Sequence, residues 1–186
     1  SQLKALKAQK ENKFKEEIVD FKIQSKNAEI NFNKDEHPRE GINLDALSRL
    51  KPAFKIDGTV TAGNASGIND GAAAVTLMSG QEAEKRSLEK LVSVKSWASC
   101  GVDPALMGTG PIPSAKKALD LAGWKIDEVD LFEINEAFAA QSIAVIKELK
   151  IPEQKVNVNG GAIALGHPIG ASGARILVTL VHEMIK

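Results

Sequence analysis

The chain has 186 residues, which suits one ordinary domain or two small ones. Hydrophobic residues make up 43% of it, enough for a core, and 24 Lys and Arg balance 24 Asp and Glu. This balance lacks the basic surplus typical of proteins that bind nucleic acid or anionic membranes. No apolar run approaches the ~18–20 residues of a membrane helix. A single cysteine argues against an internal disulfide framework and fits a reducing compartment, and the cysteine and three histidines show no zinc spacing.

The first 90 residues alternate between helix-prone, polar and small-residue segments. Four lysines recur at three-residue intervals from Lys4, so they lie on one side of a helix. They form either a solvated face or a positive rim for an anionic ligand, and both interpretations stay open. The expected elements are a helix within 1–20, a strand near 18–23, a polar loop to residue 40, a helix over 44–50, a buried strand over 72–78 and a helix over 81–87.

From residue 91 the strand and helix patterns alternate regularly. This alternation argues for α/β layering with a mostly parallel sheet. Gly123 is expected to end a helix, because glycine readily adopts the left-handed conformation found there. The expected strands cover 91–97, 129–134 and 156–158, and the expected helices cover 114–122, 136–150 and 172–185.

Three segments rich in small residues, 64–71, 135–139 and 157–173, are candidates for function. In layered α/β proteins, function collects where strands end and glycine-rich turns begin. The last segment holds His167 among its glycines. A lone histidine is usually a structural group, but this setting favours proton transfer, because imidazole titrates near neutral pH.

Asn135 follows the expected strand over 129–134 directly. Its amide could donate to an oxyanion or hold an ordered water. Alternatively, it could cap the following helix, a position that asparagine favours. The residues alone leave these two alternatives open.

The run from 157 to 173, with Asn-x-x-Gly-Gly, Gly-His-Pro and Ser-Gly, resembles the thiolase signature. Asn-Glu-Ala-Phe-Ala at 135–139, Asn-Ala-Ser-Gly at 64–67 and Met-Gly-Thr-Gly-Pro at 107–111 are similar to three further landmarks of that family. The likeness runs the full length of the chain, and 101–113 is most similar to the short-chain, acetoacetyl-CoA type, acetyl-CoA C-acetyltransferase. The resemblance implies an α/β, thiolase-like layered fold: a mixed β-sheet flanked by helices, with part of a loop domain.

The resemblance also implies a division of the chain. Residues 1–68 would end a substrate-binding loop domain, 69–90 would be the last strand and helix of the N-terminal domain, and 91–186 would be an incomplete C-terminal domain. Thiolases use two cysteines, and Cys100 matches neither position, so we interpret it as a small structural residue. We therefore expect a thiolase segment whose nucleophile lies outside this chain, and no turnover by the 186 residues alone.

The resemblance implies roles for particular residues. His167 would deprotonate the nucleophilic cysteine and face the thioester oxygen, and Asn135 would hold the water that completes the oxyanion hole. Ala46 stands where some relatives have a CoA-contacting serine, so one polar contact is expected to be missing. The residues expected to bind CoA or shape the acyl pocket are Arg39, Ala65, Ser66, Ile68, Met107 and Phe138.

The implied substrates are acetyl-CoA, acetoacetyl-CoA and CoA, with no metal and no further cofactor. The implied partners are other copies of the chain in a dimer or tetramer, not nucleic acid or membrane. The implied location is the cytoplasm, or the mitochondrial matrix in a eukaryote. Two alternatives remain: a non-catalytic CoA-binding or scaffolding fragment, and a nucleotide-binding α/β domain. The second is weak, because no Gly-x-Gly-x-x-Gly follows a first strand and no Walker lysine motif is present.

Overall fold

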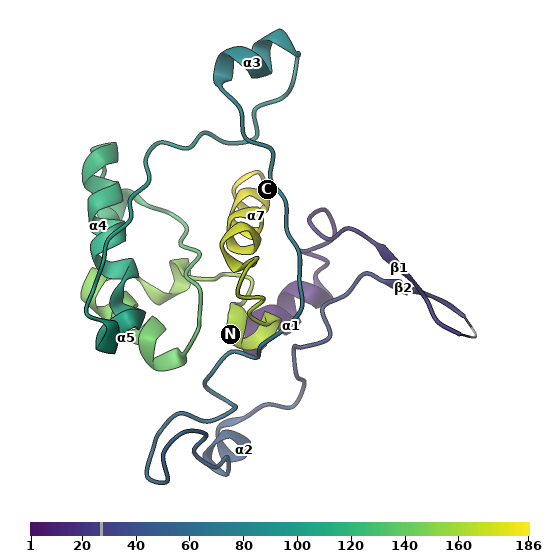
Figure 1. Ribbon diagram of the computed structural model, residues 1–186, viewed down its shortest axis with the longest axis vertical. Coiled ribbons are helices and arrows are strands. Elements are labelled where there is room, and N and C mark those ends of the chain that lie inside the picture. Colours follow the sequence, from purple (N-terminus) through teal and green to yellow (C-terminus); the bar gives the residue numbers. More distant parts are fainter. Residues whose placement is uncertain (27) are drawn as a thin grey trace.

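Helices and long extended segments make up the chain (Figure 1). The structure is a computed structural model, and it describes residues 1–26 and 28–186. The helices are α1 (Gln2–Lys10), α2 (Leu44–Ser48), α3 (Gly80–Lys85), α4 (Pro111–Ala122), α5 (Ala139–Leu149), α6 (Ala162–Leu165) and α7 (Ser172–Met184). Three 3-10 turns, η1 (Pro104–Thr109), η2 (Ile126–Glu128) and η3 (Glu153–Lys155), and two strands, β1 (Phe21–Gln24) and β2 (Glu29–Phe32), complete the described elements.

The helices begin and end at residues with clear capping chemistry. Asn43 and Ser79 each accept a hydrogen bond from the backbone N–H of the third residue of the helix that follows, at 2.9 Å for α2 and 3.2 Å for α3. Gly123 ends α4 with φ of 70°, as predicted. The expected helices over 44–50, 81–87, 114–122 and 172–185 are therefore present, with ends shifted by a few residues.

The region expected to be a loop after residue 23 contains a second strand. β2 pairs antiparallel with β1, with Phe21 opposite Phe32 and Ile23 opposite Ile30. The sequence interpretation was wrong here, because it weighed the polar residues and overlooked the alternation of apolar and polar side chains in β2. The hairpin projects away from the other elements, and every residue in both strands is exposed.

The strands expected over 72–78 and 91–97 are present only as extended chain. Figure 1 shows one segment running beside α7 up to α3 and the other returning toward α4. Neither forms a strand ladder with any part of the chain that the structure describes. Their apolar side chains stay open to solvent, with Leu77 72% and Trp97 79% exposed. The residues have strand character, but a strand also needs a partner.

In place of the strands expected over 129–134 and 156–158, the structure has one isolated parallel bridge between Phe132 and Val156. Phe132 donates to the Lys155 carbonyl and accepts from Asn157 N–H, each at 2.8 Å. This bridge lies against a core of buried residues to which α5 contributes, and partly buried side chains of α4 pack on that core. The buried members of that core are Val145, Leu149, Ile151 and Val156.

The start of the chain lies against the glycine-rich loop that follows residue 157. Ser1 Oγ accepts from Gly161 N–H at 2.9 Å, and Lys4 Nζ donates to the Val156 carbonyl at 2.7 Å. Gly160 has φ of 91°, and a Cβ there would come within 2.7 Å of Ala5. Lys4 is therefore bonded to the fold and is not part of a free lysine rim.

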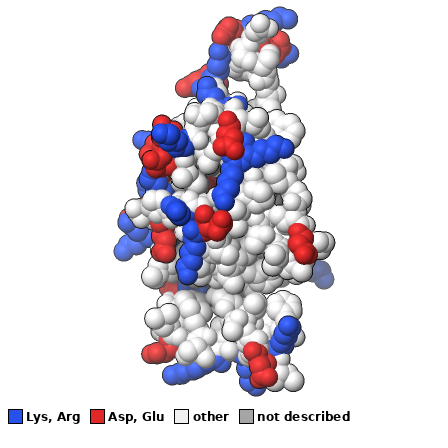
Figure 2. Space-filling model, turned by 90° about the vertical axis from the view of Figure 1, so that its left-hand side faces the viewer, with Lys and Arg blue, Asp and Glu red and all other residues white. Residues whose placement is uncertain are grey.

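Charged side chains of both signs are interspersed on the face that carries α4 (Figure 2). In residues 1–26 and 28–186, no helix combines the length and the apolar character required to cross a membrane. The same residues contain no group of three or more His, Cys, Asp or Glu side chains suited to a metal ion.

Candidate active site

His167 lies in the loop between α6 and α7, and this loop docks on the segment 64–71. The His167 N–H lies 3.1 Å from the Gly67 carbonyl and 3.3 Å from Asn69 Oδ1, and Ile68 forms a parallel bridge with His167. Gly166 has φ of 98°, and a Cβ there would lie 2.6 Å from Asn69 Oδ1. Only glycine permits this close approach, so two of the three candidate segments meet at His167.

Each nitrogen of the His167 ring has a polar neighbour. Nε2 lies 3.3 Å from Asn135 Nδ2, and Nδ1 lies 2.6 Å from Ser172 Oγ. Asn135 and His167, which the sequence assigns to one site, thus share one face of the fold. Asn135 Oδ1 is buried and has no hydrogen-bond partner among the described residues.

The alternative role for Asn135, as a helix cap, is wrong. α5 begins at Ala139, its N-cap residue is Phe138, and no side chain caps it. The expected helix over 136–150 therefore starts three residues late, and Asn135 is left in non-helical chain. An asparagine side chain that does not cap a helix is available for another hydrogen-bonding role.

Asn157 fixes the backbone on which Asn135 sits, and the sequence analysis missed this function. It is 3% exposed, its Oδ1 accepts from Ile134 N–H at 2.8 Å, and its Nδ2 donates to the Ile134 carbonyl at 2.8 Å. Nδ2 also lies 3.1 Å from Glu136 Oε1, and Glu136 Oε2 accepts from Ile163 N–H at 3.1 Å. Its place as the first residue of the 157–173 motif was the sequence signal that could have identified Asn157 as a functional residue.

The segment 64–71 also docks on the residues that precede α5. Ser66 donates to the Ala137 carbonyl from both its N–H and its hydroxyl, each at 3.1 Å. Ala65 forms an antiparallel bridge with Phe138, whose ring packs edge to face on Phe54 at 6.3 Å between centroids. Because the Ser66 proton is used internally, its oxygen can only accept from a ligand.

The structure brings together six of the eight predicted site residues. These are Ala65, Ser66, Ile68, Asn135, Phe138 and His167, and Ile68 is 90% exposed. The backbone N–H of Arg39 donates to Gln2 Oε1 at 2.9 Å. Met107 is in η1 and is 65% exposed. No hydrogen bond or bridge in the described part of the chain joins these last two to the other six.

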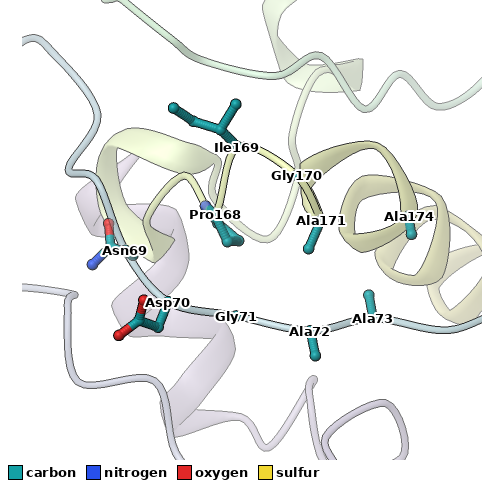
Figure 3. A pocket seen from close by; sticks show the side chains of 10 residues that line it. All are labelled: Asn69, Asp70, Gly71, Ala72, Ala73, Pro168, Ile169, Gly170, Ala171 and Ala174. Carbon is teal, nitrogen blue, oxygen red and sulfur yellow. The ribbon is translucent and has the colours of Figure 1, made fainter.

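A pocket of about 490 Å³ lies beside this site, between residues 69–73 and the start of α7 (Figure 3). Gly71 faces Pro168 there, and a Cβ on Gly71 would lie 2.8 Å from Pro168 Cγ. A second pocket of about 580 Å³ shares this wall and extends to Glu17 and Arg175. Neither pocket is lined by Ser66 or His167, so the expected contact of Ser66 with CoA stays a prediction.

Three partly buried carboxyl groups interact electrostatically with Arg175 on α7, a feature that the sequence analysis also missed. Burial raises the pKa of Glu133 to about 8 and that of Glu17 to about 7, and it also raises the pKa of Asp35. The positive charge of Arg175 opposes all three shifts. Its three guanidinium nitrogens are buried without a hydrogen-bond partner in the described residues. Burial of this kind depends on tertiary packing, so no local sequence signal marks it.

Cys100 lies in extended chain just after residues 91–97. Its side chain is partly buried, and no hydrogen bond joins it to a histidine in the part of the chain that the structure describes. The described residues therefore provide no histidine hydrogen bond of the kind that activates a thiol at Cys100.

Comparison with family models matches residues 1–81 to the thiolase N-terminal domain and residues 88–186 to the thiolase C-terminal domain. The chain therefore belongs to the thiolase family, and the predicted resemblance is confirmed. It is 59% identical to acetyl-CoA acetyltransferase of Shinella zoogloeoides and 56% identical to the cytosolic acetyl-CoA acetyltransferase of Rattus norvegicus. Each of these alignments covers 99% of this chain and 47% of the relative, so the chain spans about half the length of these relatives.

Solved structures confirm the α/β thiolase-like fold. Acetyl-CoA acetyltransferase of Bacillus anthracis superimposes with a TM-score of 0.96 at 50% identity, over 99% of this chain and 47% of that one. Human mitochondrial 3-ketoacyl-CoA thiolase superimposes with a TM-score of 0.91 at 41% identity, over 98% of this chain and 46% of that one. The names of the relatives support the acetoacetyl-CoA type within the family.

Proposed function

We propose that the protein is part of an acetyl-CoA C-acetyltransferase, which condenses two acetyl-CoA molecules or cleaves acetoacetyl-CoA with CoA. The observation that carries this proposal is the approach of Asn135 Nδ2 to His167 Nε2 at 3.3 Å, in a chain of the thiolase family. An imidazole nitrogen beside an uncharged amide donor suits proton transfer next to a developing oxyanion.

His167 would act as the base in both half-reactions. In thiolysis it accepts the proton of a cysteine thiol, and the thiolate attacks the keto carbon of acetoacetyl-CoA. The adjacent carbon–carbon bond breaks, acetyl-CoA leaves as its enolate and takes up the proton that His167 had accepted, and the acetyl group stays on the cysteine. The thiol of CoA then gives its proton to His167 and attacks this thioester, the bond between the acetyl carbon and the cysteine sulfur breaks, and a second acetyl-CoA leaves. The released cysteine thiolate takes the proton back from His167, which restores the starting thiol and base. Asn135 would stabilise the oxyanion through a bound water.

The cysteine nucleophile in this proposal belongs to polypeptide outside this chain. Two observations support this assignment: Cys100 has no described histidine partner, and the chain spans about half the length of its relatives. The unpaired extended segments over 72–78 and 91–97 would receive their partner strands from the same polypeptide. The division of the chain at residues 68 and 90 is part of this proposal.

The CoA and acyl groups would lie along the segments that meet at His167. Ser66, Ala65 and Ile68 would contact the pantetheine arm, and Phe138 would border the acyl group. Arg39 would contact the nucleotide end of CoA, and Met107 would border the acyl group from η1. The assembled enzyme would be a dimer or tetramer, and the cytosolic names of some relatives support a cytoplasmic location.

A non-catalytic CoA-binding fragment is the second candidate function. The setting of Cys100 favours it for the 186 residues alone. The two candidates differ in what happens when the remaining parts of a relative's sequence are added as a separate polypeptide.

Thiolysis of acetoacetyl-CoA by this mixture tests the proposal. We expect no turnover by either polypeptide alone, turnover by the mixture, and a loss of at least ~10²-fold in kcat with His167→Ala. His182→Ala, at a partly exposed position of α7, provides the matched control and should leave kcat unchanged. A folded, stably docked mixture without turnover would favour the non-catalytic alternative.

A further inference from the structure

Ser172, the first residue of α7, touches the ring nitrogen of His167 that faces away from Asn135. We propose that Ser172 is a positioning residue, which holds neutral His167 in the tautomer that carries its proton on Nδ1. Nε2 then keeps its lone pair. The role of this tautomer in catalysis rests on the proposed function. The assignment of the tautomer rests only on the hydrogen-bond geometry around His167.

The proton count at Ser172 points to this tautomer. Ser172 Oγ lies 3.0 Å from the Pro168 carbonyl and 2.6 Å from His167 Nδ1. A carbonyl oxygen only accepts, and a serine hydroxyl has one proton to donate. When Oγ donates to Pro168, it must accept from His167, so the proton lies on Nδ1.

The contact on the other side of the ring agrees. Asn135 Nδ2 is a donor, and it lies 3.3 Å from His167 Nε2. A proton on Nε2 would place two donors against each other. The same tautomer therefore satisfies both neighbours of the ring.

The burial of Ser172 stabilises its hydrogen bond with His167 Nδ1. Its side chain lies in a residue that is 4% exposed, so water does not compete for the Nδ1 hydrogen bond. Its backbone N–H bonds the Pro168 carbonyl at 2.8 Å, so the first turn of α7 is held without the hydroxyl. Removing the Ser172 hydroxyl is thus expected to change the protonation pattern of the His167 ring and to leave the first turn of α7 folded.

The chain offers two internal references for the measurement. His37 Nδ1 lies 2.8 Å from the Ala164 carbonyl, which requires a proton on Nδ1 in neutral His37, independently of Ser172. His182 lies on α7, ten residues beyond Ser172, and has no described side-chain hydrogen bond. A global disturbance would move all three histidines, whereas loss of the Ser172 contact would move only His167.

Nitrogen-15 NMR of the histidine rings in the 186-residue chain tests the proposal, at a pH where the rings are neutral. We expect His167 to show a protonated Nδ1 and an unprotonated Nε2, with the signals assigned by their loss in His167→Gln. Ser172→Ala should shift the population toward the Nε2-protonated form that free imidazole side chains favour. Ser172→Thr, which keeps the hydroxyl, should retain the wild-type pattern, and His37 should not change in either variant.

A protonated Nε2 in the unsubstituted chain would overturn the proposal, and so would an unchanged His167 pattern in Ser172→Ala. If Ser172→Ala does not fold, the wild-type and Ser172→Thr spectra decide the tautomer by themselves. In the reconstituted enzyme, Ser172→Ala should lower kcat at least ~10-fold with little change in KM. Because the spectra need no turnover, failure of the proposed activity leaves this test of the tautomer intact.

Discussion

Gly161 approaches the carboxylate of Glu136 so closely that a Cβ on Gly161 would lie 2.6 Å from Glu136 Oε1. The same carboxylate accepts from the N–H of Ile163 at 3.1 Å. Glu136 follows Asn135 directly, and Gly161 lies on the loop that leads to His167. This contact therefore joins the two segments that carry the candidate catalytic side chains.

Gly161→Ala is expected to displace the Glu136 carboxylate and destabilise the chain. The cost should be about 1–3 kcal/mol in the free energy of unfolding, as for other overpacked sites. Chemical denaturation measures this change. Gly170→Ala is the matched control, because no heavy atom lies within 4 Å of the added Cβ, and it should shift stability by less than ~0.5 kcal/mol. Equal effects of the two substitutions would contradict the packing argument.

Asn157→Ala is expected to cost on the order of 2–3 kcal/mol, because it leaves buried groups of Ile134 and Glu136 without their partner. Denaturant unfolding measures the loss. Exposed Asn31→Ala, which removes one surface hydrogen bond to Asp20, serves as the comparison and should be nearly neutral. A smaller effect of Asn157→Ala than of Asn31→Ala would show that this network does not hold the site.

The partly buried carboxyl groups of Glu133 and Glu17 predict lower stability as the pH rises. Glu133 and Glu17 have pKa values of about 8 and about 7 in the folded chain, against 4.5 for the ordinary glutamate side chain. The folded state therefore binds more protons than the unfolded state between pH 4.5 and these values, and stability falls as the pH rises through this window.

Glu133→Gln tests this pH dependence, because the amide mimics the protonated carboxyl and does not titrate. Thermal unfolding measured from about pH 5 to pH 8 should show a smaller loss of stability in the variant than in the unsubstituted chain. Exposed Glu16→Gln should keep the original slope. A wild-type stability that rises through this range would contradict the assignment.

The unpaired segments predict self-association of the isolated chain. The segment over 72–78 has no backbone hydrogen bond to the described residues and carries exposed apolar side chains, the combination that promotes edge-to-edge pairing. Light scattering should therefore detect dimers or larger species at high concentration. Leu77→Lys should weaken the association, whereas Leu44→Lys, on exposed α2, should not. A clean monomer at every concentration would contradict this prediction.

Local signals in the sequence predicted the helices well. Asn43, Ser79 and Gly123 determine where helices begin or end through hydrogen bonds and backbone conformation within a few residues. Apart from the local pairing of β1 with β2, strand pairing could not be predicted in the same way, because such a ladder depends on a partner that is distant in sequence. The segments over 72–78 and 91–97 have the composition of strands and still lack a ladder within residues 1–26 and 28–186.

In the candidate site, too, local motifs could be predicted from the sequence, whereas contacts that depend on tertiary packing could not. Motifs with fixed spacing marked His167, Asn135 and Ser66, and the structure brings these three segments together. The burial of Arg175 among carboxyls and the hydrogen bonds of Asn157 depend on tertiary packing, which composition and periodicity do not reveal. Arg39 and Met107 remain predictions, because no described contact joins them to the rest.

Mass spectrometry of the reconstituted enzyme after incubation with acetyl-CoA is the most direct measurement of the central claim, that this chain supplies the base and another polypeptide supplies the nucleophile. The account predicts an acetyl group on a cysteine of the added polypeptide, none on Cys100, and loss of this acetylation with His167→Ala but not with Cys100→Ser. An acetyl group on Cys100, formed by the 186-residue chain alone and lost with Cys100→Ser, would contradict it.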